Sequence, residues 1–247
     1  MTTVNNNGVT IYYEVLGAGQ PVVLLHGFTA SRAQWHYSGL AAELAKEHQV
    51  ILVDLRGHGR SSKPHDQALY SLDERLSDIN AVLDDLGVDQ AHLLGYSMGG
   101  WLAFGMAARY PERVASLMIG GAHPFAESAE PFYQVSGEDP QAFLEALETF
   151  IGETIADAAR PLVLQNDLVA LVAAAVDRQD LSEALGEASI PMLLFVGEQD
   201  KRLNAMKTTA ERFDAELIML PGVGHAMTLF SGASLAGALK AFLRKVA

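Results

Sequence analysis

From residue 21 onward the chain contains short, uninterrupted apolar runs, and stretches of helical character separate most of them. A strand that is apolar on both faces must be buried on both, so these runs predict parallel strands covered by helices. Alternating strands and helices indicate a doubly wound α/β sheet. The runs are PVVLL at 21–25, VILVD at 50–54, AHLL at 91–94, VASLMI at 114–119, PMLLFV at 191–196 and ELIML at 216–220.

Local signals predict where several of the other elements begin and end. The dipeptide Asn7-Gly8, followed by alternating apolar and polar residues, predicts a β-hairpin at the N-terminal end. Ser71 and Glu74 form a capping box, and Gly87 marks the end of the helix that this box begins. A weaker box near residue 31 predicts a helix that reaches about residue 47.

The segment between about residues 123 and 188 interrupts the alternation, because it contains helical patterns and no clear strand. Asp139-Pro140 starts one of these helices, and Pro161 breaks or restarts another. We therefore expect an α/β core formed by residues 1–122 and 189–247. Residues 123–188 are predicted to form a helical lid that is inserted after the sixth strand.

Composition excludes several classes of function. The net charge of -13 and the pI of about 4.9 disfavour nucleic acid and membrane-surface partners, because an acidic surface repels phosphate groups. The chain has no cysteine, which excludes disulfides, thiolate metal sites and a cysteine nucleophile. No secretion signal or membrane span is apparent, so we expect a soluble, cytoplasmic protein. The oligomeric state is left open.

Residues 95–99 read GYSMG, which fits the pattern G-x-S-x-G. The pattern alone is weak, but here it follows an apolar strand and precedes a helical stretch, which is the setting that the motif needs. Glycines on both sides allow a sharp turn that exposes the serine hydroxyl at the carboxyl end of the strand. Ser97 is therefore the predicted nucleophile.

A serine hydroxyl needs a base to take its proton, and the base needs a carboxylate to orient it. His225 lies in a glycine-containing loop directly after the run ELIML, and Asp200 follows the preceding run. The order Ser97, Asp200, His225 predicts a catalytic triad. Glu198 and Asp54 are the rival acids, since each also lies at or near the end of a strand.

The oxyanion formed during acyl transfer needs two preorganised hydrogen-bond donors. The backbone N–H of Met98 is one candidate, because amides in the first turn of a helix lack internal acceptors. The backbone N–H of Phe28, in the loop after the run PVVLL, is the other. His26 in the same loop is predicted to be structural. No metal or cofactor is expected, since the sequence lacks the closely spaced histidines that are typical of a zinc site.

Taken together, these motifs resemble the α/β-hydrolase superfamily over almost the whole chain. The resemblance implies an α/β-hydrolase fold with an eight-stranded, mostly parallel sheet, helices on both faces and a short helical lid. It also implies that the loop of residues 54–59, His58 included, supports the site and is not catalytic. The motifs are LLHGF at 24–28, DLRGHGRS at 54–61, GYSMGG at 95–100, GEQD at 197–200 and GVGH at 222–225.

Within the superfamily, a serine nucleophile argues against dehalogenases and soluble epoxide hydrolases, which place aspartate there. The sequence is most similar to small esterases, enol-lactonases and carbon–carbon bond hydrolases. We therefore expect hydrolysis of a small ester or lactone through an acyl-enzyme. A carbon–carbon hydrolase or lyase with the same triad stays open, as does a non-catalytic ligand-binding protein. Five residues are candidates for an apolar pocket, although core packing explains any one of them as well: Phe125, Phe132, Tyr133, Phe143 and Met227.

Overall fold

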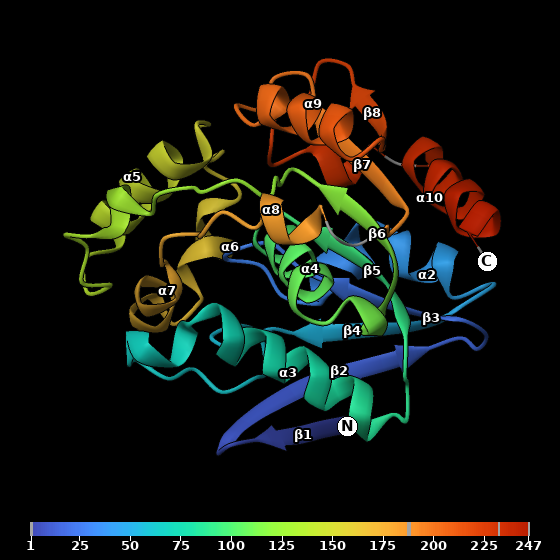
Figure 1. Ribbon diagram of the computed structural model, residues 1–247. Coiled ribbons are helices and arrows are strands. Elements are labelled where there is room, and N and C mark those ends of the chain that lie inside the picture. The colour runs from blue at the N-terminus through green and yellow to red at the C-terminus, as the bar shows by residue number, and fades with distance from the viewer. Residues whose placement is uncertain (1, 187–188, 232, 247) are drawn as a thin grey trace.

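The computed structural model describes residues 2–186, 189–231 and 233–246, and eight strands within these ranges form a single sheet (Figure 1). Their order across the sheet is β1-β2-β4-β3-β5-β6-β7-β8. The prediction of an eight-stranded, mostly parallel sheet is confirmed. The strands are β1 (Thr2–Asn6), β2 (Val9–Leu16), β3 (Pro21–Leu25), β4 (Gln49–Asp54), β5 (Ala91–Tyr96), β6 (Val114–Gly120), β7 (Met192–Gly197) and β8 (Glu216–Leu220).

Of the eight strands, only β2 runs in the opposite direction to the others. β1 and β2 form the predicted hairpin, and β2 also pairs antiparallel with β4. The hairpin turn contains Asn7 at φ 51° and Gly8 at φ 87°, a positive-φ pair that suits a tight two-residue turn. Every pairing from β3 to β8 is parallel, so the carboxyl ends of these strands meet at one edge.

Helices cover both faces of the sheet, as predicted. One face packs against α3 (Leu72–Asp85), α4 (Met98–Arg109), α8 (Ser182–Leu185) and α9 (Leu203–Arg212). The other face packs against α1 (Ala33–Tyr37), α2 (Leu40–Leu44) and α10 (Ala233–Val246). Successive residues of the central strands alternate between these two cores, which is why the apolar runs are continuous.

The predicted helix from residue 31 to about residue 47 is instead two short helices, α1 and α2. Gly39 separates them in a left-handed conformation with φ 76°, which ends one helix and redirects the chain before the next. Trp35 of α1 and Leu40 of α2 are both buried against the sheet. The apolar pattern of this stretch therefore reflects burial, and the glycine decides where the helix breaks.

Short helices occupy the described part of the segment between β6 and β7. Asp139 caps α5 (Pro140–Ile151), and Pro161 lies in the first turn of α6 (Arg160–Leu164). α7 (Leu168–Ala174) follows, and in Figure 1 α5, α6 and α7 gather on one side of the sheet, beyond α4. Residues 187 and 188, at the end of the predicted lid, lie outside the described residues. The remaining short helices are η1 (Gln67–Tyr70), η2 (Pro111–Arg113), η3 (Glu130–Phe132) and η4 (Thr228–Phe230).

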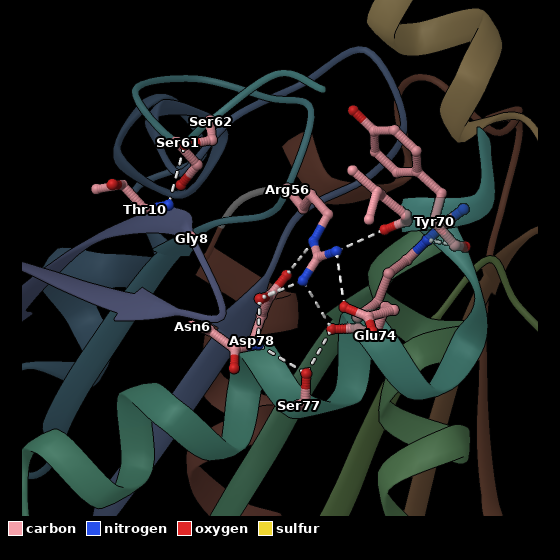
Figure 2. A network of polar contacts seen from close by, with 12 residues as sticks. Asn6, Gly8, Thr10, Arg56, Ser61, Ser62, Tyr70, Glu74, Ser77 and Asp78 are labelled. Carbon is pink, nitrogen blue, oxygen red and sulfur yellow. Dashed lines mark hydrogen bonds and ion pairs between the residues drawn. The ribbon is translucent and has the colours of Figure 1, made fainter. Parts of the chain in front are cut away.

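The loop after β4 is fixed to α3 by a buried ion pair (Figure 2). Arg56 donates to both carboxylate oxygens of Asp78 at 2.8 Å and to one oxygen of Glu74 at 3.0 Å. Asn6 of β1 also donates to Asp78 at 2.8 Å, so three separate segments meet at this carboxylate. These contacts give residues 54–59 the supporting place that the resemblance implies.

Within the described residues, no helix combines the length and apolar character needed to cross a bilayer.

We expect Asp78→Ala to lower the free energy of unfolding by about 3–5 kcal/mol, because it leaves the buried guanidinium of Arg56 without its main partner. Asp84→Ala is the matched control, since Asp84 pairs with Arg113 at the surface and should cost less than about 1 kcal/mol. Urea denaturation measures both variants. Equal losses would contradict the anchoring role of Asp78.

Candidate active site

Ser97 lies at a sharp turn between the end of β5 and the start of α4. Its backbone adopts φ 51° and ψ −111°, a conformation that non-glycine residues rarely occupy. The N–H of Ser97 donates to the carbonyl oxygen of Gly120 at the end of β6, over 2.8 Å. Such strain persists only where the surroundings hold it, and it is common at functional sites.

The glycines of the motif are required because the backbone packs without room for a side chain. A Cβ atom on Gly99 would lie 2.0 Å from the carbonyl oxygen of Leu25, and one on Gly95 would lie 2.4 Å from that of Gly99. The N–H of Gly99 also donates to the carbonyl oxygen of His26 at 3.1 Å. The turn at Ser97 and the loop after β3 are thus held against each other.

The structure brings Ser97, His225 and Asp200 together in one chain of contacts. Nε2 of His225 lies 3.0 Å from Oγ of Ser97. On the other side of the ring, Nδ1 of His225 lies 2.6 Å from Oδ2 of Asp200. All three side chains are buried, and both distances fit a nucleophile, a base and an orienting carboxylate.

Neighbouring groups fix both the histidine and the aspartate. The hydroxyl of Tyr96 donates to the carbonyl oxygen of His225, and the N–H of Arg202 donates to Oδ1 of Asp200 at 2.9 Å. Burial alone raises the pKa of Asp200, but the hydrogen bond to His225 and the Arg202 N–H outweigh it. The pKa of Asp200 therefore lies below its ordinary value, which keeps this carboxylate ionised at neutral pH.

Neither rival acid is bonded to His225. Asp54 is fully buried, and its carboxylate accepts from the backbone N–H groups of Arg32 and Arg60 at 2.8 and 2.9 Å. Glu198 is exposed at the end of β7. Asp54 thus holds its own loop in place, and the contact with the histidine ring belongs to Asp200.

Both residues predicted to supply oxyanion donors, Phe28 and Met98, line the same cavity. The loop of Phe28 lies beside the serine, since a Cβ on Gly27 would be only 3.6 Å from Cβ of Ser97. Met98 is the first residue of α4, where backbone N–H groups have no intrahelical acceptor. Phe28 and Met98 therefore both lie close to Ser97, as the predicted role of their amides as oxyanion donors requires.

His26 and His58 contact backbone atoms. Nε2 of His26 accepts from the N–H of Leu55 at 3.0 Å, and its Nδ1 lies 2.8 Å from the carbonyl oxygen of Gly27. Nδ1 of His58 lies 2.9 Å from the carbonyl oxygen of Arg56. Burial lowers the pKa of both rings. These contacts join the loops after β3 and β4, in keeping with structural roles.

The five predicted pocket residues divide between the cavity, the core and the surface. Phe132 lines the cavity, and Phe143 packs beside it in the apolar cluster of α5 and its neighbours. Tyr133 and Met227 are 55% and 53% exposed, and the ring of Phe125 contacts that of His123. The presence of an aromatic residue or a methionine in the sequence does not by itself tell whether the side chain lines the cavity, packs in the core or lies at the surface.

The sequence did not point to the polar and charged part of the cavity wall, which Arg75, Trp101 and Arg178 form. A signal existed for Arg75, because the helical spacing places it on the same face of α3 as the buried Leu72, Leu76 and Ile79. Arg178 lies in the irregular stretch after α7, where no periodicity marks it.

A sequence model described as the alpha/beta hydrolase fold matches residues 20–163, more than half of the chain. The chain belongs to the α/β-hydrolase fold family. This membership, together with the serine at the turn after β5, identifies it as a serine hydrolase of that family.

Individual relatives span most of the chain. The dihydrolipoyllysine-residue acetyltransferase component of the acetoin cleaving system of Pseudomonas putida is 32% identical over 95% of this chain and 66% of its own length. The 2-hydroxy-6-oxo-6-phenylhexa-2,4-dienoate hydrolase of Comamonas testosteroni is 29% identical over 87% of this chain and 84% of its own length. The structure of a thermophilic esterase from Thermogutta terrifontis, solved with malate bound, is 25% identical in sequence and has a TM-score of 0.84. The match covers 99% of this chain and 98% of the esterase chain.

We expect Gly99→Ala to abolish hydrolysis and destabilise the fold, because the new Cβ would collide with the carbonyl group of Leu25. Gly237→Ala is the matched control, since a Cβ at this position of α10 would meet no described atom within 4 Å apart from its chain neighbours and the backbone of its own helix. That change should be neutral or stabilise the helix by about 0.5–1 kcal/mol. Thermal unfolding and ester turnover of both variants test the packing, and an active Gly99→Ala enzyme would contradict it.

Proposed function

We propose that this family member cleaves carboxylic esters or lactones through an acyl-enzyme on Ser97. The observation that carries the proposal is the continuous chain from Asp200 through His225 to Ser97, at 2.6 and 3.0 Å. A hydroxyl at this position, with a base in reach and an orienting carboxylate behind it, is suited to attack a carbonyl carbon. Similarity over nearly the whole chain to an esterase supports the same chemistry.

In the proposed first step, Oγ of Ser97 bonds to the carbonyl carbon while its proton passes to Nε2 of His225. The carbonyl electron pair moves onto oxygen, and the backbone N–H groups of Phe28 and Met98 donate to that oxyanion. When the carbonyl re-forms, the bond to the leaving alkoxide breaks, and His225 returns the proton to it. Asp200 stays ionised throughout and stabilises the imidazolium.

In the second half of the cycle a water molecule takes the place of the alcohol. His225 accepts a proton from the water as its oxygen attacks the acyl carbon, and the proton then returns to Oγ of Ser97. The products are a carboxylic acid and the free enzyme. Each atom of the cycle is supplied by the substrate, by water or by the residues named.

Two further parts of the proposal concern the surroundings of the site. We assign the role of a lid to the segment 123–188, whose helices pack through the Phe132 and Phe143 cluster onto Phe28. We also assign the enzyme to the cytoplasm with a small molecule as substrate. Fractionation of cells that express the tagged chain tests the location.

We expect Ser97→Ala to fold normally and to lose acyl transfer, because no hydroxyl remains to attack. Asp200→Asn should lower kcat by about 10⁴-fold, since an amide favours the wrong tautomer of His225. Ser234→Ala, an exposed serine on α10, is the control and should keep full activity. Steady-state hydrolysis of 4-nitrophenyl butyrate measures all three, and activity retained in Ser97→Ala would overturn the proposal.

A carbon–carbon bond hydrolase is the second candidate, because the dienoate hydrolase matches 87% of this chain at 29% identity. In that reaction His225 first acts on a hydroxyl or carbon acid of the substrate. Turnover of a 2-hydroxy-6-oxodienoate in preference to esters and lactones, with no acyl-enzyme burst on 4-nitrophenyl acetate, would favour it. A stoichiometric burst that Ser97→Ala removes would favour the esterase.

A further inference from the structure

The cavity beside Ser97 has a charged wall that ester hydrolysis alone does not require. Aromatic side chains form much of it, with Trp101, Phe132 and Phe150 among them. Two arginines, Arg75 and Arg178, also line it, and its described lining contains no carboxylate. Cationic groups on the wall of a small apolar cavity are costly unless something of opposite charge binds there.

Arg75 has no acidic partner within the described part of the chain. Its Nε donates to the carbonyl oxygen of Tyr70 at 2.8 Å, and its Nη2 donates to that of Ala174 at 2.7 Å. Both acceptors are neutral, and the guanidinium also lies 5.5 Å from the centre of the Tyr70 ring, so it is held between η1 and α7 without a directly bonded carboxylate. Only 5% of this residue is exposed.

Among the described residues, Arg178 forms an ion pair with one carboxylate, and it shares that carboxylate with another arginine. Its Nη1 lies 2.7 Å from Oε2 of Glu127, while Nη2 of Arg202 lies 2.6 Å from Oε1 of the same carboxylate. Arg178 and Arg202 are both buried, and Nε and Nη1 of Arg202 have no hydrogen-bond partner among the described residues. The carboxylate of Glu127 is therefore paired with two guanidinium groups at once.

The group thus contains three buried guanidiniums and one carboxylate, in a chain whose net charge is -13. The other nearby carboxylate, Asp200, is occupied by His225. Burial and then the charge of Arg178 lower the pKa of Arg75 to about 9. An anion placed between them would relieve both the burial cost and the repulsion.

We propose that the substrate carries a carboxylate, and that Arg75 and Arg178 bind it in the cavity next to Phe28 and Met98. The inference rests on the proposed function, because it names the substrate class of that same site. Guanidinium groups bind planar carboxylates through paired, charge-assisted hydrogen bonds. The substrate class is then a half-ester or lactone acid, with one bond to cleave and one free carboxylate to anchor it.

The first test compares matched substrates on the wild-type enzyme. Mono-4-nitrophenyl glutarate and 4-carboxyphenyl butyrate carry a carboxylate on the acyl and alcohol sides, and 4-nitrophenyl pentanoate and phenyl butyrate are their neutral partners. A charge-assisted anchor predicts a kcat/KM about 10–100-fold higher for at least one acid than for its partner. A preference for the neutral ester in both pairs would overturn the inference while leaving ester hydrolysis established.

Variants assign the preference to the two arginines. Arg75→Met and Arg178→Met should each reduce the ratio of kcat/KM between acid and neutral ester by about tenfold or more. Arg109→Met, on the exposed end of α4, removes the same charge away from the cavity and should keep the ratio. An unchanged ratio in both cavity variants would contradict the assignment. Thermal unfolding identifies a variant that has lost its fold.

Binding without turnover separates this inference from the proposed function. Calorimetry of Ser97→Ala with monomethyl glutarate, dimethyl glutarate and inorganic phosphate needs no catalysis. The carboxylate site predicts that the monoacid binds at least tenfold more tightly than the diester, and that Arg178→Met in the same background removes the difference. Equal binding of acid and diester, or binding of phosphate alone, would overturn it.

Discussion

The contact between the backbone of Gly99 and the end of β3 fixes the geometry of the whole site. Because Gly99 has no side chain, the start of α4 packs closely against the carbonyl group of Leu25. At this distance the backbone N–H of Gly99 donates to the carbonyl oxygen of His26. The same approach holds Ser97 in its strained conformation and places the loop of Phe28 beside it. The proposed nucleophile and the two proposed oxyanion donors are therefore positioned by one packing constraint between two neighbouring parallel strands.

The charges around the cavity complete this arrangement. Asp200 is ionised and bonded to His225. Arg75 and Arg178 line the cavity, but Arg75 bonds only to carbonyl oxygens among the described residues, and Arg178 shares its carboxylate with Arg202. The proposed catalytic residues thus come from the carboxyl ends of β5, β7 and β8, and the proposed recognition residues come from α3 and from the segment between β6 and β7. In this proposal the sheet positions the groups that carry out the chemistry, while α3 and the added segment together select the substrate.

The sequence was sufficient to predict the sheet, its helical cover and the residues that meet as Ser97, Asp200 and His225. Continuous apolar runs mark buried parallel strands, and the ends of such strands converge, so motifs placed there come together. The break at Gly39 was missed because one glycine in an apolar stretch is compatible with a continuing helix. Arg178 was missed because its neighbours Glu127 and Trp101 are distant in sequence and no local pattern joins them.

The most direct test of the central claim is to detect the covalent intermediate itself. The enzyme is mixed with 4-nitrophenyl acetate, quenched in acid within the first turnover and digested for peptide mass spectrometry. Acylation of Ser97 predicts one acetyl group per active site, on the peptide that contains Ser97. Hydrolysis without any acetylated peptide, or an acetyl group on another residue that forms and decays at the turnover rate, would contradict it.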